Sequence, residues 1–220
     1  MIVKVCGVRT AEVADAAVEA GADMIGLVFV ERSPRNAGDR EADAVREAVA
    51  GRADLVGVLV EPSAELCDRL ARRHRLAAVQ LHGEVDPLVV TRVSVPVIRA
   101  LNARCAAEAY TDGWWPAALL LLDSAPDDSA ALPGGTGRLL PREWAAQVAR
   151  HRPVILAGGL GPDGVADAIA AVRPRGVDAS SSLESAPGVK DAALVRAYVR
   201  TARAAFDLLG AAPAAAGEGR

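Results

Sequence analysis

Aromatic residues are scarce in this chain of 220 residues: they make up 3% of it, whereas hydrophobic residues of all kinds make up 51%. The core must therefore be built from Val, Leu, Ile and Ala, as in domains where helices pack on a sheet. Long hydrophobic runs are missing too, since no stretch approaches the roughly 18 apolar residues of a membrane span. The first apolar run is interrupted by Lys4 and is too short for a signal peptide. We expect no membrane partner.

A strong charge of one sign is also absent. The formal net charge is −3 and the isoelectric point about 5.7, which argues against nucleic acid as a partner. The three cysteines, Cys6, Cys67 and Cys105, lie far apart and form no CxxC or Cys/His spacing. Neither a disulfide framework nor a metal site is therefore expected. Free cysteines fit a reducing compartment, so we predict a cytoplasmic location.

What the sequence does contain is a repeated alternation. Apolar, β-branched runs alternate with Ala-, Glu- and Arg-rich segments whose apolar residues follow a helical period, for example Ala11 to Ala20 and Val165 to Val172. The order is strand then helix, eight times. The predicted strands are Ile2 to Cys6, Met24 to Val30, Leu55 to Val60, Ala77 to His82, Pro96 to Leu101, Ala118 to Asp123, Pro153 to Ala157 and Gly176 to Ser180.

Such near-continuous apolar strands indicate a parallel sheet that is covered by helices. Eight strands can close into a single (β/α)8 barrel of the TIM type, which we predict over residues 1–208. An open, doubly wound sheet is the alternative, but its GxGxxG fingerprint is missing after the first strand, where the chain reads Cys6-Gly7-Val8-Arg9. The low-complexity residues 209–220 are expected to form a disordered tail.

In a barrel of this kind the carboxyl ends of the strands carry function, and Cys6 ends the first strand. An isolated strand cysteine is more often a small packing residue. However, Lys4 and Cys6 share a strand face, and a nearby ammonium would favour the thiolate, which can act as a base. A charge in the barrel interior needs a partner, and strand eight lies beside strand one. We therefore predict an ion pair between Lys4 and Asp178.

Asp123 ends the sixth strand, across the barrel from Cys6. It caps the following turn or acts as a general acid or base. The segment 124–140, which contains Pro-Gly-Gly-Thr-Gly, is long enough for a lid or binding loop, the alternative being an ordinary flexible excursion.

The last two strand ends resemble a phosphate site. Glycine lets the backbone approach an anion, and free N–H groups stabilise it. The residues concerned are Gly158, Gly159, Ser180, Ser181 and Ser182. Elsewhere, Arg35 is either a surface charge or a fork for a substrate carboxylate. His82, at the end of strand four, is either a satisfied core or rim histidine or has a direct chemical role.

These motifs together resemble the phosphoribosylanthranilate isomerase family over about residues 1 to 205. The residues that carry the resemblance are Lys4-Val5-Cys6-Gly7, Gly21-Ala22-Asp23, Gly26-Leu27-Val28-Phe29, Ser33-Pro34-Arg35, Val79-Gln80-Leu81-His82-Gly83, Leu122-Asp123-Ser124, Gly134-Gly135-Thr136-Gly137, Leu156-Ala157-Gly158-Gly159-Leu160, Val177-Asp178-Ala179-Ser180-Ser181, Glu184 and Pro187-Gly188-Val189-Lys190-Asp191.

The resemblance implies a (β/α)8 enzyme of tryptophan biosynthesis. Its reaction is the Amadori rearrangement of N-(5-phosphoribosyl)anthranilate to 1-(2-carboxyphenylamino)-1-deoxyribulose 5-phosphate, without a cofactor. By similarity, Asp123 is the general acid and Cys6 the general base. Arg35 would hold the anthranilate carboxylate, and the loops after strands seven and eight would hold the phosphate. His82 and Asp178 would also contact the substrate. We expect a monomer or a homodimer.

The chain departs from the family pattern at Ser182, where the family usually has glycine. If that glycine adopts a positive φ, serine would cost something of the order of 1 kcal/mol and weaken phosphate binding. Two alternatives follow. One is the related isomerase of the histidine pathway, which uses aspartates at the corresponding strand ends, so that Cys6 argues against it. The other is a non-catalytic barrel that binds a phosphorylated ligand.

Overall fold

The eight predicted strands form a closed parallel barrel in the order β1-β2-β3-β4-β5-β6-β7-β8. The structure is a computed structural model that describes residues 1–101, 119–123 and 142–211. Because β1 pairs with β8, the sheet has no free edge and the open-sheet alternative is excluded. Every strand lies within two residues of its predicted bounds: β1 (Ile2–Cys6), β2 (Met24–Val28), β3 (Asp54–Val60), β4 (Ala78–His82), β5 (Val97–Leu101), β6 (Leu119–Asp123), β7 (Val154–Ala157) and β8 (Gly176–Ala179).

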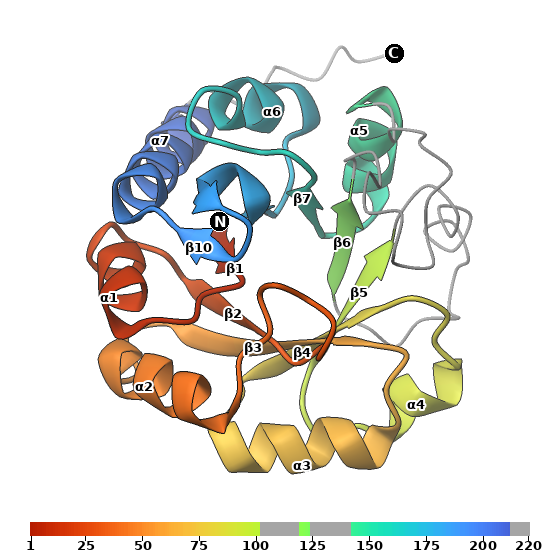
Figure 1. Ribbon diagram of the computed structural model, residues 1–220. Helices are drawn as coiled ribbons and strands as arrows, with labels where there is room; N and C mark the ends of the chain where they lie inside the picture. Colours follow the sequence, from red (N-terminus) through yellow and green to blue (C-terminus); the bar gives the residue numbers. More distant parts are fainter. Residues whose placement is uncertain (102–118, 124–141, 212–220) are drawn as a thin grey trace.

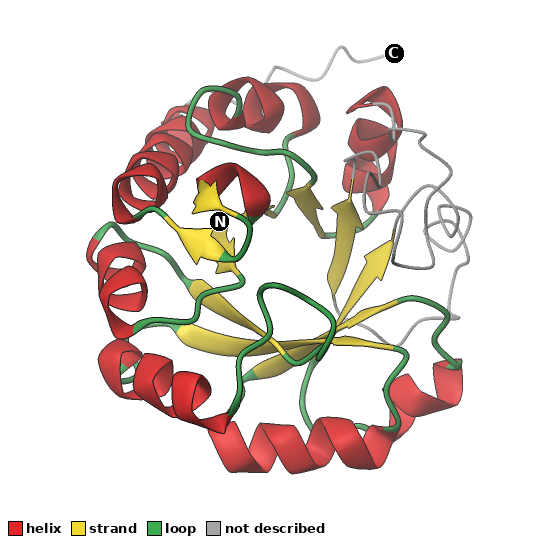
Figure 2. Ribbon diagram, viewed as in Figure 1, coloured by secondary structure: helices red, strands yellow, loops and turns green. Residues whose placement is uncertain are grey.

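Helices surround the barrel on the outside (Figures 1 and 2). Thr10 and Ser63 cap two of them, since their side-chain oxygens accept hydrogen bonds from the backbone N–H groups of Val13 and Leu66. The described helices are α1 (Ala11–Glu19), α2 (Asp39–Val49), α3 (Ala64–His74), α4 (Pro87–Arg92), α5 (Arg142–His151), α6 (Val165–Val172) and α7 (Ala192–Ala211).

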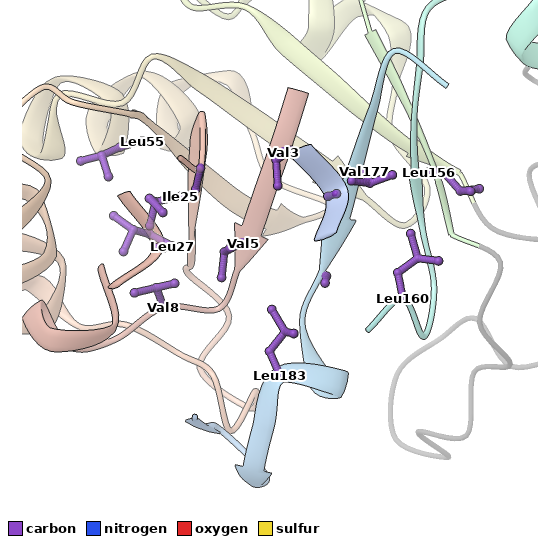
Figure 3. Close-up of a cluster of buried hydrophobic side chains, with 14 of the residues drawn as sticks. Val3, Val5, Val8, Ile25, Leu27, Leu55, Leu156, Leu160, Val177 and Leu183 are labelled. Atoms are coloured by element: carbon purple, nitrogen blue, oxygen red, sulfur yellow. The ribbon is translucent and has the colours of Figure 1, made fainter. Parts of the chain in front are cut away.

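Side chains alternate between two layers along each strand. The outer set packs against the helices in a large aliphatic cluster, part of which is shown in Figure 3, with Val3, Val5, Ile25, Leu27, Leu55, Leu156 and Val177. The inner set forms two smaller clusters. One contains Val56, Ala78, Ile98, Ala100, Leu121, Ile155 and Ala157, and the other contains Cys6, Val28 and Val58. The barrel interior is therefore packed, and Cys6 belongs to its inner layer.

Between β8 and α7 the chain makes a short detour. It forms a 3₁₀ helix η2 (Ser181–Leu183) and a two-stranded antiparallel hairpin of β9 (Glu184–Ala186) and β10 (Val189–Lys190). Leu183 is fully buried in the outer cluster (Figure 3) and anchors this detour to the barrel. The hairpin consequently holds Glu184 and Lys190 at a defined place near the end of β8.

Helix α7 continues to Ala211, three residues beyond the predicted domain end at 208. The Ala and Leu residues at this point favour the helix, which therefore extends into the segment expected to be disordered. Residues 212–220 of that tail and the proposed lid 124–140 lie outside the described residues. In the described part of the chain, no helix has the length and apolarity needed to cross a membrane.

Candidate active site

Cys6 ends β1 on the interior face of the barrel, with 7% of its surface exposed. Its neighbour on β2 is Gly26. A Cβ at Gly26 would lie 2.9 Å from the Cys6 Sγ, so glycine at that position makes room for the thiol. Val28 and Val58 complete the apolar surroundings. The thiol is thus held in one place at the carboxyl end of the barrel.

The predicted ion pair between Lys4 and Asp178 is confirmed. The two residues are register partners on β1 and β8, and the Lys4 Nζ donates a hydrogen bond of 2.9 Å to the Asp178 Oδ2. Burial alone would lower the pKa of Lys4, but Asp178 and Cys6 together outweigh burial and the pKa is raised. Burial also raises the pKa of Asp178 against the effect of Lys4. Because the Lys4 Nζ and the Asp178 Oδ2 are 2.9 Å apart and the pKa of Lys4 is raised, the pair consists of an ammonium and a carboxylate.

Lys4 does not by itself make Cys6 a thiolate. Burial raises the pKa of the Cys6 thiol, and Asp178 adds to this, whereas the ammonium groups of Lys4 and Lys190 lower it. The net direction is upward, so the thiol form prevails in the protein alone. The expectation that Lys4 favours the thiolate is right in sign, but its effect is outweighed by the burial of the thiol and by the negative charge of Asp178.

Replacing Lys4 by methionine is expected to lower the free energy of unfolding by about 3–5 kcal/mol, since Asp178 would remain as an unpaired buried charge. Urea denaturation would measure it. The double variant Lys4→Met/Asp178→Leu should lose clearly less, because it leaves no uncompensated charge. As a control, Arg72→Ala breaks a pair on α3 whose arginine is 72% exposed, and it should cost less than about 1 kcal/mol. Equal losses in all three variants would contradict this prediction.

Arg35, Glu184 and Lys190 form a charge network beside Cys6. The Arg35 Nε and Nη2 donate to the two oxygens of Glu184 at 2.7 and 2.9 Å, and Lys190 also pairs with Glu184. Although burial alone would raise the pKa of Glu184, the two cations hold it below its ordinary value. The carboxylate is therefore ionised and orients both cations.

The network lies against the Cys6-Gly7 backbone. Gly7 has a φ of 76°, and a Cβ there would lie 2.9 Å from the Arg35 Cδ and 3.3 Å from the Lys190 Nζ. A larger residue would push both cations away. At Gly188, a Cβ would lie 2.2 Å from the Pro34 carbonyl oxygen, so glycine at this position also lets the hairpin approach the Arg35 loop closely.

The loops after β7 and β8 contact each other. Ser182 donates a hydrogen bond from its Oγ to the Leu160 carbonyl oxygen. Gly158 and Gly159 have φ values of 96° and 65°, which glycine adopts without strain. The Ser180 Oγ donates to the Cys6 carbonyl oxygen at 3.2 Å, which ties the second loop to the end of β1. Ser181 is exposed in η2.

The expected strain at Ser182 does not arise. Among the described non-glycine residues, positive φ is found at Ala50, Glu61, Arg75 and Arg173 and not at Ser182. Serine in place of the family's glycine is accommodated in the 3₁₀ helix, where its hydroxyl bonds the neighbouring loop.

His82 and Asp123 end β4 and β6. The Nε2 atom of His82 lies 2.6 Å from the Gln80 Nε2. Burial, with smaller contributions from Lys4 and Arg99, lowers the pKa of His82 to about 4, so the imidazole is neutral near pH 7. Asp123 is partly buried and is the register partner of Ala157. Both face the carboxyl end of the barrel interior with Cys6, as the strand alternation predicts.

Sequence reasoning assigned no role to Lys190 or Gln80. Gln80 shares a strand face with His82, so the alternation of side chains along β4 could have indicated that Gln80 lies beside it. Lys190 was part of a motif, but nothing local placed it beside Cys6. No group of three His, Cys, Asp or Glu side chains suited to a metal occurs within 1–101, 119–123 and 142–211.

Comparison with known proteins gives a consistent result. The family model described as N-(5'-phosphoribosyl)anthranilate (PRA) isomerase matches residues 3–201. An N-(5'-phosphoribosyl)anthranilate isomerase of Afipia carboxidovorans is 40% identical, covering 93% of this chain and 90% of the relative.

Solved structures agree. A dimeric phosphoribosylanthranilate isomerase of Thermotoga maritima, solved as mutually generated monomers, is 30% identical with a TM-score of 0.76, covering 93% of this chain and 100% of that one. An isomerase in complex with reduced 1-(o-carboxyphenylamino)-1-deoxyribulose 5-phosphate is 29% identical with a TM-score of 0.76 and the same coverage. With its closed barrel and a family match over nearly its whole length, this chain belongs to the N-(5'-phosphoribosyl)anthranilate isomerase family.

Proposed function

We propose that this protein isomerises N-(5-phosphoribosyl)anthranilate to 1-(2-carboxyphenylamino)-1-deoxyribulose 5-phosphate in tryptophan biosynthesis. Beside family membership, the observation that carries the proposal is the position of Cys6. It lies on the inner face at the carboxyl end of the barrel, next to Gly26, whose lack of a side chain leaves room for the thiol. A cysteine so placed suits proton abstraction from a bound sugar phosphate.

In the proposed mechanism, Asp123 protonates the furanose ring oxygen, and the ring opens to a Schiff base. Cys6 then removes the proton from C2, and the resulting enolamine tautomerises to the ketone. This order of steps, with Schiff base formation before proton removal, explains how a thiol with a raised pKa acts as a base. The protonated Schiff base brings a positive charge to the site, and a positive charge beside a thiol stabilises its thiolate.

The remaining roles follow from the chemistry of the substrate. Arg35 binds the anthranilate carboxylate through guanidinium N–H groups that Glu184 leaves available, because Glu184 takes only Nε and Nη2. Gly158, Gly159, Ser180, Ser181 and Ser182 bind the phosphate in the two contacting loops. His82 contacts substrate as a neutral imidazole. The Asp178 carboxylate is paired with Lys4. A contact between Asp178 and the substrate would therefore come from the barrel interior, below the strand ends.

The reaction needs no cofactor, because the substrate nitrogen takes up the electrons once the Schiff base has formed. The partner is thus a small phosphorylated molecule. We propose a cytoplasmic location, in keeping with free cysteines at positions 6 and 67, and a monomer or a homodimer as the assembly.

An assay with purified protein tests the proposed function. Adding the protein to N-(5-phosphoribosyl)anthranilate should abolish the fluorescence of this substrate, whereas the aminoaldose of the histidine pathway should be converted poorly or not at all. Faster conversion of the histidine-pathway substrate would favour that alternative. Tight binding of the anthranilate compound without loss of fluorescence would favour the non-catalytic barrel. The sequence feature behind that last alternative, Ser182, is now explained without strain.

A further inference from the structure

Lysine is rare in this chain, and both lysines occur beside the same thiol. Of the 25 basic residues, Lys4 and Lys190 alone are lysines, and all others are arginines. Lysine differs from arginine in carrying a compact point charge that can be buried in a small space. Both Lys4 and Lys190 act on the ionisation of Cys6. Their placement indicates that compact positive charges are buried beside this thiol.

The two lysines are not equivalent. Lys4 is paired with a single carboxylate, Asp178, which itself acts against the thiolate of Cys6. Lys190 shares Glu184 with Arg35, so this group of three side chains carries two positive charges and one negative charge. The network next to Cys6 therefore has a net positive charge, whereas the Lys4 pair has none.

Geometry places the Lys190 ammonium at the end of β1. Its Nζ lies 3.5 Å from the Ser180 Oγ, which in turn bonds the Cys6 carbonyl oxygen at 3.2 Å. The Nζ also lies 3.3 Å from the position that a Cβ of Gly7 would occupy. The Lys190 side chain is 1% exposed. The ammonium is therefore enclosed beside the end of β1, at a place from which its charge reaches the thiol.

We propose that Lys190 is a positioning residue of the reaction, whose ammonium, held by Glu184, stabilises the thiolate of Cys6. This inference rests on the proposed function, because the thiolate is the base of the isomerisation. The charged groups facing Cys6 are Lys4 on its own strand, Asp178 on β8 and Lys190 on β10. Those facing Lys190 are Glu184, Arg35 and Cys6.

The test compares wild type with Lys190→Met, Lys190→Arg and Lys190→Met/Glu184→Gln. The rate of Cys6 alkylation by iodoacetamide is measured against pH by peptide mass spectrometry, without substrate. Methionine keeps the length of the side chain but removes the charge. We expect the pKa of Cys6 to rise by about one unit, which lowers the thiolate fraction and the alkylation rate at neutral pH about tenfold. Arginine should restore part of the rate.

Several controls separate charge from structure. Cys67, in the same samples, is buried and its pKa is raised by burial to about 11, so it should stay unmodified while the barrel is folded. The double variant leaves Arg35 as the remaining charge of the network, so the net positive charge returns and the shift should be smaller than in Lys190→Met; an equal shift in both variants would indicate a structural role. A change in thermal stability without a change in the pH profile would likewise indicate a structural role.

Turnover provides the second readout. In Lys190→Met, kcat near pH 7 should fall about tenfold with little change in KM, and it should recover as the pH rises and the thiolate forms. The inference is overturned if the alkylation profiles of Lys190→Met and wild type superimpose. If the profiles shift but wild type does not convert N-(5-phosphoribosyl)anthranilate, the proposed function fails and the electrostatic role of Lys190 stands.

Discussion

Replacing Cys6 by alanine is expected to lower kcat for N-(5-phosphoribosyl)anthranilate by about 10²- to 10⁴-fold, the usual contribution of a general base. Alanine removes the group that accepts the C2 proton and leaves the strand intact. The free energy of unfolding should change by no more than about 1 kcal/mol, because one small buried atom is lost. Fluorescence assays and urea denaturation on the same preparation measure both quantities.

Cys67→Ala is the matched control for this prediction. Cys67 is fully buried in α3 and belongs to the outer cluster, so its removal affects packing but not the barrel mouth. This variant should lose some stability and keep its kcat. Cys6→Ser adds a second comparison, since a hydroxyl of similar shape is a far weaker base and should be nearly inactive. Full turnover by Cys6→Ala would show that another group removes the proton.

Changing Asp123 to asparagine is expected to reduce kcat by a similar factor of about 10²- to 10⁴-fold. Asparagine has the same shape but carries no proton of the required acidity, so ring opening should become the slow step. Asp123 lies at the carboxyl end of β6, and the substitution should leave the barrel folded. Steady-state kinetics together with circular dichroism would measure activity and folding.

Asp54→Asn is the control for Asp123. Asp54 begins β3 and is exposed, so it lies at the opposite end of a barrel strand from the proposed site. Its substitution should leave kcat and KM unchanged. If Asp123→Asn retains wild-type kcat, the ring oxygen is protonated by another group and the assigned role is wrong.

The elements of the fold could be predicted because their signals are local. Each strand is an apolar, β-branched run, and each helix has its own periodicity and, at Thr10 and Ser63, its own cap. Boundaries were less certain: α2 begins at Asp39, whereas the first buried apolar residue of this helix is Ala42. The acidic residues of its first turn favour a helix start although they are not part of the apolar pattern.

The pairing of Lys4 with Asp178 was also predictable, although 174 positions separate the two residues. Barrel closure brings the first and last strands together, and strand alternation then decides which side chains meet. The same reasoning placed Cys6, His82 and Asp123 at the same end of the barrel. Where the barrel topology and the alternation of side chains along a strand decide a contact, that contact can be predicted from the sequence even between residues far apart in the chain.

Other features depended on the tertiary structure. The contact of Arg35 with Glu184 joins residues 149 positions apart through a hairpin outside the barrel, and no periodicity predicts that contact. The protonation state of Cys6 is a balance between burial and three charged residues, Lys4, Asp178 and Lys190, and the direction of its pKa shift cannot be read from the residues next to it in the sequence. The backbone conformation of Ser182 likewise depends on η2, where its hydroxyl meets Leu160.

The sequence by itself therefore determined the barrel, the face on which each strand residue lies and the set of strand ends that form the candidate site. The tertiary structure decided how the charges at that site are balanced and, through Gly7, Gly188 and the hairpin, placed Lys190 beside Cys6. The physical reason is that periodicity and propensity act over a few residues, whereas burial and Coulomb interactions depend on every group that folding brings close.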